Sequence, residues 1–522
     1  MENSYTKSNR EWYPHVKKDF DSCIKEEDGY MTLLACLLFL VVAGLLLVCL
    51  DGSMLFQAKA RCSMAQTGLT EHLLANYNVP LAKRYQLYFL DPHMDQKRLE
   101  EQSEAYYDEL FRGSSGVGFF SSPLWRLKTE YIEAVPFGTM QEKEFQFFIA
   151  QIEDCMKYDL SKDLTMKILG QTAQETKEHS SQIEETINKL DKNEPVVNPS
   201  PDSDDNTLTP SEVAEGEQAG NEVQKNNPLQ KLRSILEYGL LGLVTDEEGL
   251  SERKIAPSLL PFKNQSENKV KVSMNIIKNL DNIGGLIEEQ GLDKLGENLT
   301  AQGAVNLYIQ NYFNYYKRND VLKETKLLYE MEYILGGHYS DKENLEYVVN
   351  RLVLLRFALN SAYAFGNEEL RAQALSMAAM LTGITGTPEF IEAVRYIILA
   401  AVNLLESIKD VEALLNGEQV PLFKTTADWK TTIHGDNAGK TGNLGKGLNY
   451  QEHTLILLTL QTDLESKCYR MQNLMQMNIQ QEEPEFQIKN CKAGISLRTG
   501  VNAMFPFYLK DYLLENEQKT TY

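Results

Sequence analysis

The motif with the most explicit chemical meaning in this chain is Gly439-Lys440-Thr441, which matches the end of a phosphate-binding loop. The complete pattern, GxxxxGK[ST], requires another glycine five residues before Gly439. That position holds His434, and Gly435 is one residue too close. No apolar strand leads into residues 435–447, which are rich in glycine and polar residues. The segment therefore predicts a surface loop, and we expect no nucleotide binding.

The histidines and nucleophile motifs give no better indication of catalysis. No two histidines have the three-to-five-residue spacing of a zinc-binding pair, and HExxH and GxSxG are both missing. The seven histidines are His15, His72, His93, His179, His338, His434 and His453. Carboxylate pairs are so common in this acidic chain that they do not identify a general acid and base. The sequence therefore predicts no catalytic residue, no metal ligand and no cofactor.

A single apolar run near the start of the sequence indicates a membrane-spanning helix. Met31 to Leu50 contains no charged residue, and at about 1.5 Å per helical residue it reaches roughly 30 Å, the thickness of a bilayer core. The apolar core of a cleavable secretory signal has only about 7 to 15 residues. The next apolar run, Tyr396 to Leu405, is about half the length needed. We therefore expect one transmembrane helix, residues 30–50, that contacts the lipid bilayer through Met31 to Leu50.

Charges near the ends of this run predict its orientation. Lys and Arg within about 20 residues of a span favour the cytoplasmic side. The basic residues are Arg10, Lys17, Lys18 and Lys25 before the run, and Lys59 and Arg61 after it. Residues 1–29 are therefore predicted to form a short cytoplasmic tail, with the bulk of this single-pass protein outside the cell membrane.

Composition limits the remaining possibilities. With 43% hydrophobic residues the chain can bury ordinary cores, while a net charge of −22 repels phosphate backbones and predicts no nucleic-acid binding. Its seven cysteines are scattered, which favours stability from packing over a disulfide framework. Cys468 and Cys491 could pair, or could be two separately buried thiols.

The periodicity predicts a mainly α fold with a small antiparallel β-sheet. Apolar residues recur at three- and four-residue spacing from Met54 to Leu74, so the transmembrane helix should continue as a long juxtamembrane helix that ends near Pro80. Residues 51–190 form a membrane-proximal α+β region, with a strand over Leu124–Val135 and a helix over Gln141–Tyr158.

Residues 191–228 are predicted to be a disordered acidic linker. Between Lys192 and Lys225 there are many acidic residues, four prolines, no Lys or Arg and no aromatic residue. Such a segment cannot bury enough apolar surface to offset its ordering entropy. Asp202, Asp204 and Asp205 suggest calcium, but the Gly turn and distal Glu of a calcium loop are missing.

Residues 229–522 are predicted to form a mainly helical extracytoplasmic domain with C-terminal strands. Thr387-Pro388 should cap one long helix, and Ser340 with Glu343 should form a capping box at the start of another. A tyrosine stripe on one helical face, expected to pack in the core, contains Tyr308, Tyr312, Tyr315 and Tyr316.

Three further elements of this domain are predicted from local patterns. Tyr329, Met331 and Tyr333 alternate with glutamates and indicate a strand that ends at Gly336-Gly337. One helix is expected over Gln451–Met477. Strands are expected at Phe486–Leu497 and Met504–Leu509, and these could pair with Leu124–Val135 in one antiparallel sheet.

Several segments together resemble a known family. They are QAKARCSMAQTGLTEHLLANYN, LAKRYQLYFLD, NPLQKLRSILEYGLLGLV, YEMEYILGGHYSDKENLEYVVNRLVLLRFALN, VPLFKTTADW and FQIKNCKAGISL. The chain resembles a bacterial (Firmicutes) single-pass membrane family of unknown function associated with Tad (tight adherence) pilus and secretion loci, which is distantly similar to TadE/TadG-like pseudopilins. YILGG and VPLFKTTADW carry the resemblance most specifically. The resemblance implies no catalytic residues.

The pseudopilin analogy implies an N-terminal helix that is held in the membrane until it enters a filament. A prepilin peptidase would cut after Gly29 and make Tyr30 the first residue. Major pilins then have Glu at the fifth position, where this chain has Leu34. A stationary anchor that assists assembly fits the same layout.

These observations leave two hypotheses for the function. The first is a non-enzymatic, membrane-anchored cell-envelope protein, a pseudopilin-like or accessory component of a Tad-type pilus or secretion apparatus, that contacts other envelope or pilus-assembly proteins. The alternative is an extracytoplasmic enzyme of the cell-wall hydrolase type, with a site formed by residues far apart in sequence.

Overall fold

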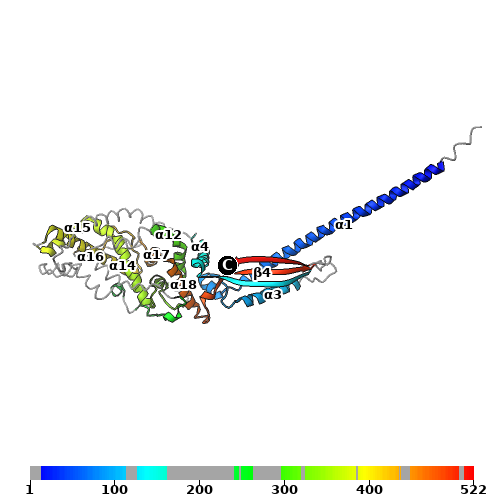
Figure 1. Cartoon of the computed structure of the whole chain (residues 1–522). Helices are drawn as coiled ribbons and strands as arrows, with labels where there is room; N and C mark the ends of the chain where they lie inside the picture. Colours follow the sequence, from blue (N-terminus) through cyan, green and yellow to red (C-terminus); the bar gives the residue numbers. More distant parts are fainter. Residues whose placement is uncertain are drawn as a thin grey trace, which may run out of the picture. The chain divides into compact units, whose positions relative to one another are not determined.

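The fold was analysed in a computed structural model of the chain (Figure 1). The structure describes residues 13–112, 126–160, 240–245, 249–262, 295–318, 324–383, 386–433, 435–436, 447–461, 463–504 and 511–522. The predicted acidic linker and Gly439-Lys440-Thr441 lie outside these residues.

Contacts divide the chain into two compact units, and both contain segments that are far apart in sequence. The first unit comprises Met1–Asn76, His93–Phe137 and Gly494–Thr521. The second comprises Tyr77–Pro92, Gly138–Ala493 and Tyr522. The chain therefore leaves the first unit, forms nearly all of the second, and returns.

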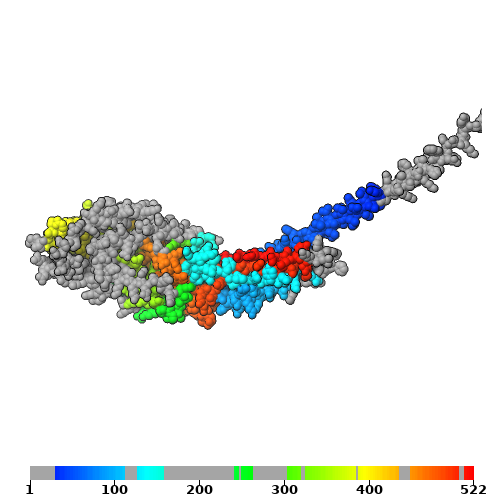
Figure 2. Space-filling model, viewed as in Figure 1, coloured from blue at the N-terminus to red at the C-terminus, as the bar shows by residue number. Residues whose placement is uncertain are grey.

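The first unit is organised by α1 (Tyr13–Leu74), one continuous helix. The described side chains from Tyr30 to Leu50 are almost all exposed, and Figure 2 shows them with no other described residue packed around them. This part is long and apolar enough to span a membrane. Burial then begins on one face, at Ala58, Cys62, Ala65, Leu69 and Leu73. The predicted continuation of the apolar helix is confirmed.

The buried face of α1 packs against α3 (Gln96–Arg112) and a three-stranded sheet (Figure 1). The strands are β1 (Arg126–Thr139), β4 (Lys492–Met504) and β5 (Tyr512–Thr521), in the order β1-β4-β5. The side chain of Gln66 on α1 joins helix to sheet, because its Nε2 donates to the Leu497 carbonyl and its Oε1 accepts from the Thr499 hydroxyl, both at 3.3 Å. The predicted pairing of the early strand with the C-terminal strands is confirmed.

The C-terminal strands differ in position from the prediction. The first begins at Lys492 rather than Phe486. Of the strand predicted over Met504–Leu509, Met504 is the last residue of β4 and the remainder lies outside the described residues, while β5 was not predicted. In β5 only Leu514 is buried. An edge strand with one covered position lacks the apolar alternation that would have identified it in the sequence.

The second unit is mainly helical. Its helices are α2 (Val79–Tyr85), α4 (Glu142–Leu160), α9 (Leu241–Val244), α12 (Leu295–Tyr312), α13 (Glu330–Gly336), α14 (Asp341–Gly366), α15 (Glu368–Thr382), α16 (Pro388–Leu415), α17 (Tyr450–Leu460) and α18 (Leu464–Ile479). Short 3₁₀ turns cover Pro257–Leu259 and Ile488–Asn490, and β2 (Thr431–Thr432) pairs with β3 (Gly435–Asp436). Together with the small sheet of the first unit, this confirms the predicted fold class.

The helix ends follow local capping chemistry. Thr387 caps α16 with Pro388 at its first position, as predicted. The Ser340 hydroxyl accepts from the Glu343 N–H at 3.3 Å, which is the serine half of the predicted capping box. A reciprocal capping box occurs instead at Asn449 and Glu452, where α17 begins.

Two predictions in this unit are wrong. Residues 330–336 form the helix α13 rather than a strand. The alternation was misleading because Glu330 and Glu332 are buried as completely as the aromatic residues beside them, so the segment has no solvent face. The helix predicted over Gln451–Met477 is two helices, α17 and α18, which are separated after Leu460.

The tyrosine stripe is also only partly helical. α12 ends at Tyr312, so Tyr315 and Tyr316 lie in the turn that follows it. Tyr308 and Tyr312 stack with ring centroids 4.5 Å apart. The tyrosines contribute to the core, as expected.

The sheet generates a test of its register. A Cβ at Gly494 would lie 2.3 Å from the backbone oxygen of Thr520 on β5. Gly494→Ala should therefore lower the free energy of unfolding by about 1–3 kcal/mol, measured by denaturant titration of the full chain in detergent. Gly303→Ala on α12, where the Cβ meets no atom within 4 Å, should be neutral or stabilise by up to about 1 kcal/mol. Equal effects of the two substitutions would contradict the register.

Candidate functional site

A buried cluster of charges fixes residues 420–431 to the helices α14 and α16. Arg356 of α14 donates from Nε and contacts from Nη2 the Asp410 carboxylate of α16, both at 3.0 Å. The Lys424 ammonium contacts both Asp410 and Glu406. All four side chains are almost fully buried. Two cations therefore neutralise two carboxylates inside the core.

Backbone groups complete this cluster. Arg356 Nη1 donates to the carbonyls of Pro421 and Leu422 at 3.0 and 3.1 Å. Glu406 accepts from the N–H groups of Lys430 and Thr431 at 3.0 and 2.7 Å. The charges thus hold an irregular segment in place of a helix or strand. This explains why VPLFKTTADW is so distinctive in sequence.

The electrostatics of this cluster keep it ionised. Burial opposes ionisation of Asp410, but Arg356 and Lys424 outweigh it and lower the pKa of that carboxyl. His453 of α17 lies nearby and has its Nδ1 2.9 Å from the Asn449 carbonyl, so Nδ1 carries the proton. Burial, and then the charge of Arg356, lower the pKa of His453 to about 3. It is a neutral core histidine.

A second buried group consists of the carboxylates of α13. Glu330 accepts from the N–H of Asn314 at 2.9 Å and from Asn478 Nδ2 at 2.6 Å. Glu332 accepts from the N–H of Tyr316 and from the Tyr450 hydroxyl, at 2.9 and 2.6 Å. Burial raises the pKa of both glutamates to about 7.

Two carboxyls that titrate near neutrality have the chemistry of an acid and base pair. Both, however, are at most 1% exposed, and each accepts one of its hydrogen bonds from a backbone N–H of the chain that follows α12. Their role in this structure is to bind unpaired backbone N–H groups there.

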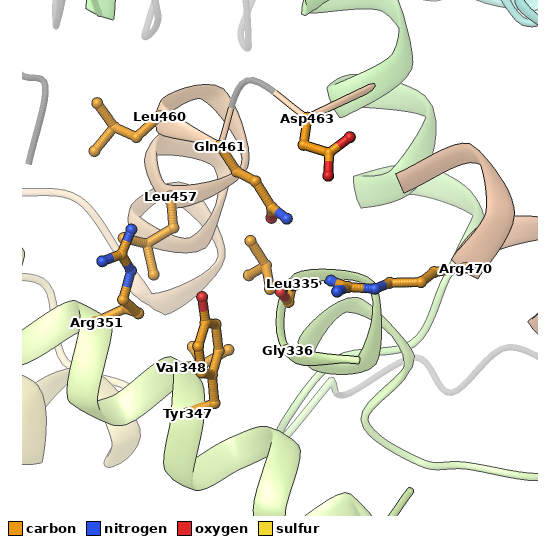
Figure 3. A pocket seen from close by; sticks show the side chains of 10 residues that line it. All are labelled: Leu335, Gly336, Tyr347, Val348, Arg351, Leu457, Leu460, Gln461, Asp463 and Arg470. Atoms are coloured by element: carbon orange, nitrogen blue, oxygen red, sulfur yellow. Dashed lines mark hydrogen bonds between the residues drawn. The ribbon is translucent and has the colours of Figure 1, made fainter. Parts of the chain in front are cut away.

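The candidate binding site is a pocket of about 270 Å³ where four helix segments meet. The C-terminal end of α13, one face of α14, the end of α17 and the start of α18 line it. Figure 3 shows polar side chains that converge on its centre: Arg351, Tyr347, Gln461, Asp463 and Arg470. Apolar contacts come from Leu335, Val348, Leu457 and Leu460.

The wall formed by α13 depends on Arg470 of α18. Its Nη1 donates to the carbonyls of Ile334 and Leu335 at 2.6 and 2.7 Å, which are acceptors at a helix C-terminus. Gly337 has a φ of 74°, and a Cβ there would lie 2.7 Å from Arg470 Nη2. The second glycine of YILGG is thus required by both conformation and space.

The opposite side of the pocket is formed by the break between α17 and α18. Gln461 is the C-terminal cap of α17, and Asp463 is the N-terminal cap of α18. Asp463 accepts from the Ser466 N–H at 3.0 Å and from its hydroxyl at 2.5 Å. Asp463 is exposed, and although its limited desolvation raises the pKa of its carboxyl, those hydrogen bonds and the charges of Arg470 and Lys467 lower it.

Arg351 and Tyr347 lie one turn apart on α14, so both side chains reach the pocket from the same face. Arg351 makes no hydrogen bond or ion pair with any residue in the described part of the chain. A half-buried guanidinium in a pocket is suited to bind an anion.

Sequence reasoning did not find this pocket. Its residues come from four elements between 335 and 470 and form no local motif. The predicted continuous helix over Gln451–Met477 also concealed the break that forms one side. The available signal was YILGG, since two adjacent glycines at a helix end indicate a close approach.

The sequence predicted no catalytic, metal or cofactor residue. Among the residues described, no three His, Cys, Asp or Glu side chains are grouped to hold a metal. Cys468 and Cys491 are separate, buried, free thiols rather than a pair. Burial raises the pKa of Cys468 to about 12, so its thiol is not activated.

Comparison with known proteins adds one result. The profile of a family of unknown function (DUF5702) matches residues 218–503, more than half of the chain. Searches of curated proteins and of solved structures gave no match. The matched region contains the helices α12 to α18, both buried charge groups, the pocket and nearly all of β4. It does not contain α1, α3, β1 or β5.

The buried cluster of charges predicts that loss of one of its carboxylates strongly lowers the stability of the fold. Asp410→Asn leaves Arg356 and Lys424 with one carboxylate between them, and should lower the free energy of unfolding by about 3–5 kcal/mol. Glu392→Gln, in the same helix, removes a 2.5 Å surface ion pair with Arg395. This substitution should change the free energy of unfolding by less than about 1 kcal/mol. Denaturant titration compares the two. Similar values would contradict a buried, mutually neutralised cluster.

His453 predicts a pH dependence. Its pKa is lowered, so the unfolded chain takes up a proton near pH 6.5 while the folded chain does not until about 3. Stability from His453 is therefore lost as pH falls from about 6.5, by about 2 kcal/mol at pH 5.

His453→Asn, whose amide can replace Nδ1, should abolish this loss when free energies of unfolding are compared at pH 7 and 5. Glu330 and Glu332 act in the opposite sense, because their raised pKa values add stability as pH falls below about 7. Both proteins share that contribution, so it cancels. If the free energies of unfolding of the wild type and His453→Asn differed by the same amount at pH 7 and at pH 5, that result would contradict a neutral His453.

Proposed function

The chain belongs to this family of unknown function, and we propose that it is a non-enzymatic, membrane-anchored envelope protein and a pseudopilin-like or accessory component of a Tad-type pilus or secretion apparatus. The observation that carries the proposal is the continuity of α1. Its stretch from Met31 to Leu50 is apolar on all sides, and the part that follows, from Ala58 to Leu73, is apolar on the single face that packs against α3 and the sheet.

This arrangement supports a pseudopilin-like role because it couples a lipid-embedded helix directly to a folded unit. In pilin-like proteins one N-terminal helix serves both purposes. Here the antiparallel sheet that covers α1 is made of strands from before and after the second unit. Most of the helical second unit, Gly138–Ala493, is therefore inserted between β1 and β4, and a shorter part, Tyr77–Pro92, lies between α1 and α3.

The proposed topology follows from the charge distribution. Four basic residues before the apolar run and two after it favour a cytoplasmic N-terminus, with the second part of α1, the sheet and the second unit outside the cell membrane. In that location the partners are other envelope or pilus-assembly proteins.

Helix continuity gives a test that separates anchoring from function. Gly52 lies on α1 just after the apolar run, and a Cβ there meets no atom within 4 Å. Gly52→Ala should strengthen the helix, whereas Gly52→Pro removes a backbone hydrogen bond and bends it, at a cost of about 3 kcal/mol or more. Both variants keep the apolar run and the sheet-packing face intact.

The two variants should be expressed in a host strain that lacks the gene. We expect Gly52→Ala to restore surface pili and adherence, measured by electron microscopy and a cell-binding assay, and Gly52→Pro to fail although equal amounts reach the membrane. Two results would contradict the proposal: a deletion strain with normal pili, secretion and adherence, or full rescue by Gly52→Pro.

A further inference from the structure

We propose that the pocket between α13, α14, α17 and α18 binds a small molecule that carries both a carboxylate and a nitrogen donor. This chemistry occurs in a free α-amino acid and in the C-terminal residue of a peptide. The inference is independent of the proposed assembly role, because it concerns only the second unit.

The carboxylate partner is Arg351. Arg351 is half-buried, lines the pocket and contacts no acidic group of the described residues, so among these residues its guanidinium donors have no acceptor. The Tyr347 hydroxyl points into the same space one turn earlier. Together they offer the donors that planar carboxylate recognition uses. Arg470 contributes positive charge from the opposite wall, although its Nη1 is already bonded to carbonyls of α13.

The nitrogen partner is Asp463. It points into the pocket in Figure 3, beside the carboxamide of Gln461. Its capping bonds and neighbouring cations keep it ionised, so it can accept from an ammonium or an amide N–H. A ligand with only negative charge would be repelled by Asp463, and a ligand with only positive charge would be repelled by the arginines. A molecule that carries both a carboxylate and a nitrogen donor satisfies both.

The size of the pocket limits the ligand further. Its volume of about 270 Å³ is at the small end of ligand pockets, which hold roughly 300–1,000 Å³. The apolar contacts, Leu335, Val348, Leu457 and Leu460, leave room for a short aliphatic side chain. One or two small amino-acid residues fit this description, and a nucleotide or an oligosaccharide does not.

The test uses three probes and the full-length chain in detergent, with binding measured by isothermal titration calorimetry. L-Alanine carries both groups, N-acetyl-L-alanine replaces the ammonium with an amide N–H, and L-alaninamide lacks the carboxylate. We expect at least one of the two carboxylates to bind, and L-alaninamide to bind about tenfold more weakly or not at all. Preference for L-alanine identifies a free amino acid, and preference for N-acetyl-L-alanine identifies a peptide C-terminus.

Two variants assign the contacts. Arg351→Met keeps the aliphatic stem and should weaken carboxylate binding about tenfold or more. Asp463→Ser keeps a capping hydroxyl for α18 and should weaken binding of the preferred probe by a similar factor. The matched controls are Arg371→Met and Glu465→Ser, which remove the same charges from exposed positions of α15 and α18 and should leave binding unchanged. Thermal unfolding midpoints show that each variant is folded.

Two outcomes would overturn the proposal. One is no binding of either carboxylate probe up to about 10 mM, which is weaker than a specific pocket should give. The other is binding that folded Arg351→Met and Asp463→Ser retain at the wild-type level.

Discussion

A bilayer does not hydrogen-bond to the backbone, so a segment that crosses it must satisfy its N–H and C=O groups within its own helix. α1 extends this constraint beyond the apolar run, because the same helix continues to Leu74 without a break. The sheet and α3 are therefore built against a rod whose direction is set by the membrane-spanning part. The change from an apolar surface on all sides to one apolar face occurs over Asp51 to Ala58.

The second unit is held by a different kind of interaction. Its long segments between helices are fixed by buried charged and amide side chains that bind their backbone groups. Arg356 and Glu406 bind residues 421–431, while Glu330 and Glu332 bind the chain after α12. Breaking one partner of such a group leaves a buried charge or an unpaired N–H, which is more damaging than loss of a surface contact.

The sequence allowed accurate prediction where one strong local signal dominated. The continuation of α1 from the apolar run to Leu74 follows from the three- and four-residue spacing of apolar residues, and the start of α16 follows from Thr387-Pro388, whereas the start of α1 at Tyr13, within the predicted tail, was not predicted. Prediction failed where burial is two-sided or nearly absent. The glutamates of α13 are buried like its aromatic residues, which imitates a strand, and β5 covers only Leu514. The pocket could not be predicted, since it depends on tertiary contacts among four helices.

The most direct test of the central claim is a distance along α1 in lipid. Spin labels at Val48 and Thr67, both exposed, would be placed in a chain in which Cys23, Cys36, Cys49 and Cys155 are replaced by serine. Double electron–electron resonance in nanodiscs should give one narrow distribution near about 28 Å, from 1.5 Å per residue. A broad distribution, or one centred well below that distance, would show a hinge between the membrane span and the sheet and would contradict a single continuous helix.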